Sequence, residues 1–128
     1  MHTFHKQEQP WHNFTRWNIY NEHASVQLEL WPETQSFGGT AYIYALYVNP
    51  DQRRKGLAAA LLDEAEAIAK AAGHKSVHLD WNLKDTPREV LEYYFRRGYD
   101  EREFDGHGTY CLLEKKLTTP KQNNNETL

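Results

Sequence analysis

Alternating apolar and polar residues predict strands in the first third of the chain. Residues 15–20 and 25–30 alternate with a period of two, which gives each strand one apolar face. Residues 21–24 between them predict a hairpin loop. Residues 40–48 are apolar at both alternating sets of positions, a pattern typical of a central strand covered on both faces.

The period then changes to that of a helix. Between residues 56 and 72 the apolar side chains recur on one stripe, alanine is abundant, and charged residues occupy the other faces. Gly73 suits the left-handed residue that often follows a helix. Residues 76–81 predict a strand in which Val77, Leu79 and Trp81 share one face.

The last part of the chain predicts a second helix and a hairpin. Thr86-Pro-Arg-Glu89 is typical of a capping box with proline at the first helical position, and the helix extends over 87–97. Residues 99–104 and 109–117 predict a terminal pair of strands. The expected order is β-β-β-α-β-α-β-β, an α+β fold with a mixed sheet flanked by helices.

Composition excludes several classes of protein. The chain has 128 residues, and its 17 aromatic residues make it too aromatic to be disordered throughout. No apolar run reaches the roughly 18 residues that a membrane span needs, and the N-terminus MHTFHKQEQPW lacks the apolar core of a secretory signal. We expect a single domain over 1–117 and a disordered tail over 118–128, where large apolar residues are nearly absent.

Charge and cysteine content narrow the choice of partners and compartment. Cys111 is the single cysteine, which excludes an internal disulfide and favours a reducing, cytoplasmic location. In the predicted terminal strand it is typical of a buried core thiol rather than a nucleophile. The net charge of −3 provides no basic surface for nucleic acid, and we expect neither a nucleic-acid nor a membrane partner.

The segment Gln52-Arg-Arg-Lys-Gly-Leu-Ala58 lies between the predicted central strand and the first helix. A helix N-terminus exposes unpaired N–H groups and carries about half a positive charge, so it attracts phosphate. Gly56 permits close approach of the backbone, while Arg53, Arg54 and Lys55 add positive charge. The alternative is an ordinary solvated basic loop.

Three motifs together resemble the GNAT superfamily of acetyl-coenzyme A-dependent N-acetyltransferases. Arg53-Arg-Lys-Gly56-Leu-Ala58 matches the family signature [QR]-x-x-G-x-[GA]. Tyr93-Tyr94-Phe-Arg-Arg-Gly98-Tyr99 is similar to the family's aromatic pair followed by a glycine and an aromatic residue. Residues 113–117 resemble the closing strand. The resemblance covers residues 40–117 and implies a splayed mixed sheet.

The resemblance implies acetyl-CoA as cosubstrate and direct transfer of its acetyl group, in a ternary complex, to a primary amine of a small molecule or a protein. The strand 40–48 would then splay from 76–81 and bind the pantetheine arm like an added strand, with a backbone N–H near Tyr47 or Val48 stabilising the thioester oxygen. The implied cofactor-binding residues are Leu46, Tyr47, Val48, Arg53, Arg54, Lys55, Gly56, Leu57, Ala58 and Asn82.

Tyr94 matches the tyrosine that, in the family, protonates the departing thiolate. The alternative is that Tyr94 is a core aromatic residue of a helix that also carries Tyr93 and Phe95. Tyr93 is the second candidate for the proton donor.

The general base has several candidates. His78 and Asp80 lie two residues apart and share one face of their strand. Some family members have an acidic base at the position that His78 matches, and imidazole, with an ordinary pKa of about 6.5, suits the task. The alternative is an ordinary histidine of the sheet. Glu29 is a further candidate.

The chain departs from the family pattern at three places. The family usually has two helices between its first and second strands, which shape the acceptor site, and this chain has no obvious room for them. An asparagine that the family often places seven residues before the tyrosine is Pro87 here, so Asn82 is expected to take over its cofactor contact. A subset of the family has a glutamate base where this chain has Tyr42.

No metal site is expected. His74 and His78 are four residues apart, but Gly73 ends the helix before them, so they do not share a helical face. The remaining N-terminal histidines lie in a segment that we expect to be loose.

Two further expectations concern association and the rival function. The many aromatic residues between Trp11 and Trp31 predict a homodimer interface. Because a fold does not determine a function, a non-catalytic acyl-CoA-binding or protein-interaction module on the same fold is the alternative to an enzyme.

Overall fold

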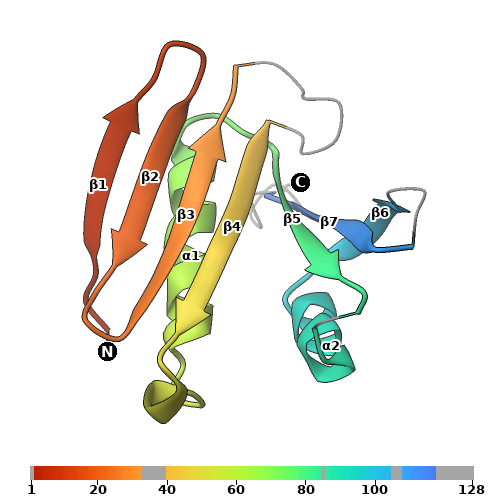
Figure 1. The fold of residues 1–128 in the computed structure, drawn as a ribbon. Coiled ribbons are helices and arrows are strands. Elements are labelled where there is room, and N and C mark those ends of the chain that lie inside the picture. The colour runs from red at the N-terminus through yellow and green to blue at the C-terminus, as the bar shows by residue number, and fades with distance from the viewer. Residues whose placement is uncertain (1, 33–39, 85, 105–107, 118–128) are drawn as a thin grey trace, which may run out of the picture.

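A computed structural model describes residues 2–32, 40–84, 86–104 and 108–117. In this part of the chain, seven strands form one sheet, accompanied by two α-helices (Figure 1). The strands are β1 (His5–Pro10), β2 (Thr15–Tyr20), β3 (Ala24–Leu30), β4 (Ala41–Val48), β5 (Ser76–Asn82), β6 (Asp100–Phe104) and β7 (Tyr110–Lys116). The helices are α1 (Leu57–Ala71) and α2 (Arg88–Arg96), and a 3-10 turn, η1, spans Pro50–Gln52. The predicted tail over 118–128 lies outside the described residues.

The sheet has the order β1-β2-β3-β4-β5-β7-β6, and only β4 and β5 run parallel. α1 connects these two strands and packs on one face, where its buried leucines meet Val26, Leu28 and Ile43. Figure 1 shows α1 behind β2–β4, with no described helix in front of them. We call this uncovered side of β1–β4 and β5 the open face. The predicted α+β class with a mixed sheet is confirmed.

The N-terminal residues form a strand that the apolar pattern did not predict. β1 pairs antiparallel with the whole of β2. Upstream of it, the His2 ring donates a hydrogen bond to the Lys55 carbonyl at 2.8 Å. The expectation of a loose N-terminus is therefore wrong. β1 is an edge strand with mostly exposed side chains, so its sequence HKQEQP needs no apolar face to join the sheet.

A β-bulge changes the course of β4. The register with β3 shifts so that Val26 faces two residues, Ala45 and Leu46, and Ala45 adopts a left-handed φ of 57°. The shift moves the alternation of β4 by one residue, which places Tyr44 before the bulge and Tyr47 after it on the open face. The predicted regular strand with two apolar faces is thus corrected to a bulged strand whose open face carries tyrosine hydroxyls.

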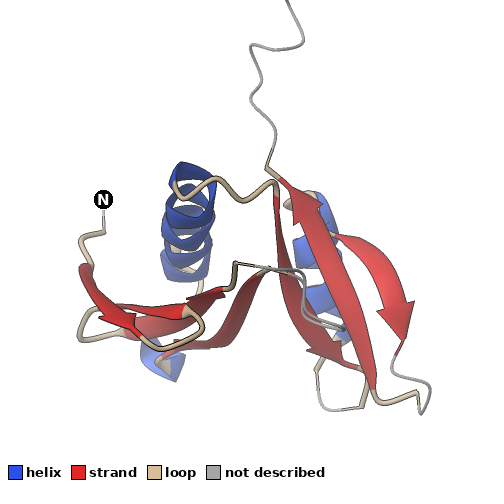
Figure 2. Ribbon diagram, turned by 90° about the horizontal axis from the view of Figure 1, so that it is seen from above, coloured by secondary structure: helices blue, strands red, loops and turns tan. Residues whose placement is uncertain are grey.

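The two halves of the sheet separate beyond the bulge. In the described part of the chain, Tyr42 opposite His78 is the single pair between β4 and β5. A bulge bends its strand and increases the local twist, and from that pair onward the two strands diverge (Figures 1 and 2). The predicted splay between 40–48 and 76–81 is confirmed.

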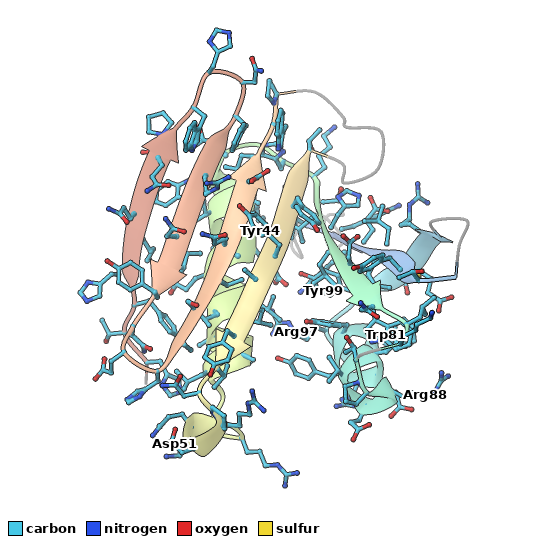
Figure 3. The ribbon with its side chains drawn as sticks, in the orientation of Figure 1. Tyr44, Asp51, Trp81, Arg88, Arg97 and Tyr99 are labelled. Atoms are coloured by element: carbon cyan, nitrogen blue, oxygen red, sulfur yellow. The ribbon has the colours of Figure 1, made fainter. Side chains whose placement is uncertain are left out.

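A buried carboxylate on α1 holds the two halves together behind the gap. Glu66, 8% exposed, accepts hydrogen bonds from Tyr99 at 2.9 Å, Arg97 at 3.1 Å and Lys115 at 2.9 Å. Arg97 also binds Asp63 at 2.8 Å. These three donors belong to the half that carries α2 and β7, and Figure 3 shows Arg97 and Tyr99 turned toward α1. Burial, and then the charge of Glu66, raise the pKa of Tyr99, which keeps its hydroxyl a donor.

α2 starts without the predicted capping box. Its N-cap is Pro87, and no side chain caps the helix. The Thr86 N–H instead donates to the Asn82 carbonyl at 3.2 Å. The capping box over 86–89 is therefore wrong, because Thr86 belongs to the turn that precedes the helix.

We expect Glu66→Ala to lower the free energy of unfolding by about 3–5 kcal/mol, because it leaves buried cationic and hydroxyl donors without their acceptor. The matched control is Glu64→Ala on the same helix, which removes a surface ion pair with Lys6 of 2.8 Å and should cost less than about 1 kcal/mol. Urea denaturation of both variants measures the difference. Equal losses in the two variants would contradict the assigned role of Glu66.

Candidate functional site

A cleft of about 630 Å³ opens between β4, the N-terminus of α1 and α2. It is lined by Leu46, Tyr47, Val48, Gln52, Arg53, Arg54, Gly56, Leu57, Ala58, Ala59, Thr86, Val90, Tyr93 and Tyr94. Eight of the ten residues predicted to bind the cofactor are in this set. The sequence did not point to Thr86 and Val90, because only the tertiary structure brings the start of α2 to the same cleft.

The other two predicted residues lie beside the cleft rather than in its lining. The Lys55 ammonium donates to the side-chain carbonyl of Gln52 at 3.3 Å, while the Lys55 carbonyl accepts from His2. The side-chain oxygen of Asn82 accepts from the Lys84 N–H at 2.9 Å, in the turn that leads to α2.

The N-terminus of α1 faces the cleft without a capping side chain. Its N-cap is Gly56, at φ 83°, and the first turn holds no acidic residue. Residues 57–59 line the cleft, and their N–H groups belong to the first turn, which has no acceptors within the helix. Left-handed residues such as Gly56 and Arg54 (φ 66°) build anion-binding loops. The Arg53 side chain fixes this loop to β4 through a 3.0 Å bond to the Val48 carbonyl.

A smaller cavity of about 220 Å³ leads from the cleft through the gap in the sheet. We call it the passage; Leu46 and Tyr94 line both it and the cleft. Its other described walls include Leu62 on the helix side and Tyr44 and Asp80 on the open face. The passage therefore connects the cleft with the face that no described helix covers.

Tyr94 stands at the junction of the cleft and the passage. Its ring packs edge-on against Tyr99, with centroids 5.8 Å apart, and lies 5.9 Å from the ring of Tyr93. Burial raises the pKa of Tyr94, so the phenol holds its proton throughout the neutral range. Tyr93 also lines the cleft, but not the described wall of the passage.

Asp80 belongs to the wall of the passage. One oxygen accepts the Tyr42 hydroxyl at 2.7 Å, whereas the other is buried with no hydrogen-bond partner among the described residues. Burial, and then this bond, raise the pKa of Tyr42, which keeps it a donor to Asp80. The resemblance marks position 42 as the place of a glutamate base, and here β5 supplies a carboxylate to the same place.

The other base candidates are placed differently. The His78 ring lies 3.3 Å from Glu114 of β7 and is not among the described walls of the cleft or the passage. Glu29 accepts hydrogen bonds from Tyr44 at 2.7 Å and from Arg16 at 3.1 Å. Burial alone would raise the pKa of Glu29. These two bonds and one from a tryptophan have the larger combined effect, so the pKa of Glu29 is lowered. Burial, and then the hydrogen bond to Glu29, raise the pKa of Tyr44 to about 12.

The described part of the chain contains no group of three or more His, Cys, Asp or Glu side chains placed to hold a metal ion. Cys111 is fully buried, and burial raises the pKa of its thiol, as expected for a core residue. Neither described helix has the length and apolar character needed to cross a membrane.

Comparison with known proteins gives the family. The family model described as "Acetyltransferase (GNAT) family" matches residues 20–99, which include β3, β4, α1, β5 and α2. The chain belongs to the GNAT acetyltransferase family. The resemblance inferred from the motifs at Arg53–Ala58 and Tyr93–Tyr99 is thereby confirmed.

Known proteins similar to this chain include N-acetyltransferases. The GNAT chain is 33% identical over 63 residues to an uncharacterised N-acetyltransferase of Methanocaldococcus jannaschii, a match that covers 49% of this chain and only 27% of the length of that protein. PaiA N-acetyltransferase of Thermoplasma acidophilum, solved with coenzyme A, has a TM-score of 0.63 at 20% identity, covering 81% of this chain and 61% of the other. The ribosomal-protein-S18-alanine N-acetyltransferase of Escherichia coli has a TM-score of 0.63 at 14% identity, covering 89% and 76%. At these identities the two structures show a shared fold.

The cleft of this GNAT chain fits the coenzyme A that the family implies. The uncapped N-terminus of α1 and the basic loop suit its pyrophosphate, and the diverging edge of β4 suits its pantetheine arm. Leu46 and Val48 pack partly against the core and give that edge an apolar lining.

We expect Gly56→Val to weaken coenzyme A binding at least tenfold, about 1.4 kcal/mol. At φ 83° a β-branched residue strains the loop, and its side chain stands where the backbone must meet a phosphate. Gly73→Val is the matched control: it has φ 96°, open space around it, and lies beyond the other end of α1. Calorimetric titration gives the affinities and thermal unfolding gives the strain. The same affinity in wild type and Gly56→Val would contradict the phosphate-binding role.

Proposed function

We propose that this chain is an N-acetyltransferase that moves the acetyl group of acetyl-CoA directly to a primary amine in a ternary complex. The observation that supports this most strongly is the passage beside the cleft, whose walls include Tyr94, shared with the cleft, and Asp80 on the open face. An acceptor entering from the open face would meet a carboxylate first and the thioester region of the cleft second.

In this proposal, Asp80 takes the proton of the acceptor. Bound acetyl-CoA supplies the reactive thioester, but an ammonium group has no lone pair and must lose a proton before it can attack. Asp80 has one oxygen held by Tyr42 and a second oxygen without a hydrogen-bond partner among the described residues. The first bond orients the carboxylate, and the second oxygen is the proton acceptor.

Tyr94 is proposed as the proton donor to the departing thiolate. Its raised pKa, caused by burial, means that it remains protonated at any pH where the enzyme is expected to work. Backbone N–H groups near Tyr47 and Val48, on the edge of β4 that lines the cleft, are proposed to stabilise negative charge on the thioester oxygen.

One observation favours the rival function, a non-catalytic acyl-CoA-binding module. β1 and β2 are joined by residues 11–14 alone, so the two helices that usually shape the acceptor site in the family are absent there. Release of free thiol from acetyl-CoA in the presence of amines separates the two functions. Tight binding of acetyl-CoA without release on any amine would favour the module.

The predicted homodimer and the cytoplasmic location stay predictions. Trp11, 55% exposed, stacks with Phe14, which in turn stacks on Trp31 at 4.5 Å between ring centroids. This aromatic cluster supports the proposed contact surface, and light scattering at micromolar concentration tests it. A mass near 15 kDa would count against a dimer.

Tyr94→Phe should lower kcat by about 10² or more while the Kd for acetyl-CoA stays within a few-fold, because only the donated proton is lost. Tyr93→Phe is the matched control, one residue earlier on α2 and in the same cleft; we expect it to stay within a few-fold of wild type. Wild-type turnover in Tyr94→Phe would show that another group or solvent donates the proton.

Asp80→Asn should lower kcat by about 10² to 10⁴, because an amide of the same shape cannot accept the amine proton. His78→Gln on the same strand face is the control, and we expect a small change since His78 contacts Glu114 instead of the passage. Steady-state kinetics across pH 6–9 on one verified acceptor compares them. A larger loss in His78→Gln than in Asp80→Asn would reverse the assignment of the base.

A further inference from the structure

The open face carries a row of amide side chains that leads to the passage. Gln7 pairs with Asn18, Asn18 with Gln27, and Gln27 with Tyr44, so one cross-strand row crosses β1, β2, β3 and β4. We call Gln7, Asn18 and Gln27 the amide row. Tyr44, at its end, belongs to the wall of the passage, and Figure 3 shows Tyr44 in the middle of β4.

A groove of about 370 Å³ follows the amide row over the open face. The three amide residues line it, together with Ser25. The bulge residue Ala45 lines both this groove and the passage. The cleft, the passage and the groove are therefore neighbouring spaces: the passage shares lining residues with each of the other two.

The sizes of these spaces limit the shape of an acceptor. Small-molecule sites usually measure about 300–1,000 Å³ and enclose most of their ligand. The passage, at about 220 Å³, has room for an amine and the carbons next to it. An acceptor too large for the passage would extend into the neighbouring groove on the open face.

The amide row has the hydrogen-bonding groups that a peptide main chain requires. The side chain of Gln27 donates to that of Asn18 at 2.6 Å, and among the described residues no other hydrogen bond engages these two amides. Gln27 thus keeps a carbonyl oxygen and Asn18 its N–H donors, which match the donors and acceptors of a peptide backbone.

We propose that the acceptor is a primary amine of a polypeptide, whose main chain lies along the amide row while its amine enters the passage beside Asp80. This inference rests on the proposed N-acetyltransferase function and specifies its substrate class. Both an N-terminal amine and a lysine side chain have the required chemistry, and the experiment distinguishes them.

The test measures free thiol released from acetyl-CoA with three sets of acceptors at equal amine concentration. The first is a mixture of lysine-free peptides with free N-termini, the second a mixture of N-terminally acetylated peptides with one lysine, and the third a panel of spermidine, an aminoglycoside and free amino acids. We expect one peptide mixture to exceed every small amine at least tenfold in kcat/KM. A small amine that equals both mixtures would overturn the inference and leave the proposed function standing.

Variants of the amide row test whether these residues bind the peptide. Asn18→Leu and Gln27→Leu should each raise the peptide KM about tenfold, with kcat and the Kd for acetyl-CoA within twofold of wild type. Gln9→Leu is the matched control: it makes the same chemical change on the same face, opposite Arg16 and outside the described groove wall. An unchanged KM in both row variants would contradict the inference. Binding of acetyl-CoA without thiol release on any acceptor would instead reject the proposed function, and the inference with it.

Discussion

β4 and β5 pair at Tyr42 and His78 and then separate, because the bulge at Ala45 turns β4 away from its parallel neighbour. A continuous parallel ladder would close the sheet and leave no route through it. The separation opens one edge of β4 to the cleft and creates the passage that ends at Asp80. The site therefore depends on the absence of ladder hydrogen bonds between β4 and β5 beyond their single pair.

A sheet interrupted in this way needs another connection between its halves. Glu66 provides it from α1, with bonds to Arg97, Tyr99 and Lys115 on the far side of the gap. Breaking such a buried cluster costs far more than breaking a surface pair, since its members have lost their water. The same helix carries Gly56 at its N-terminus, so the residue that holds the halves together and the loop that suits a phosphate belong to one rigid element.

The open face is uncovered because only a short turn joins β1 and β2. Residues 11–14 make a direct turn there, and the polar side chains of β1–β3 remain uncovered in the described structure. Gln27 and Asn18 bond to each other instead of to a covering element. A surface of this kind can contact an extended polymer along its length, whereas it can enclose little of a small molecule.

The sequence by itself determined the helices, six of the strands, and the loop of Arg53, Arg54 and Gly56, because periodicity and glycine positions are local signals. The sequence pattern did not predict the edge strand β1, since an exposed edge strand needs no apolar face. The tertiary structure alone decided which groups of β5 meet the passage. His78 and Asp80 share one face in the sequence pattern, yet Asp80 lies in the wall of the passage, while His78, at the last paired position, contacts Glu114. Which of the two residues lies in the wall of the passage depends on where β4 and β5 separate. These strands are far apart in the sequence, so no local pattern predicts the position.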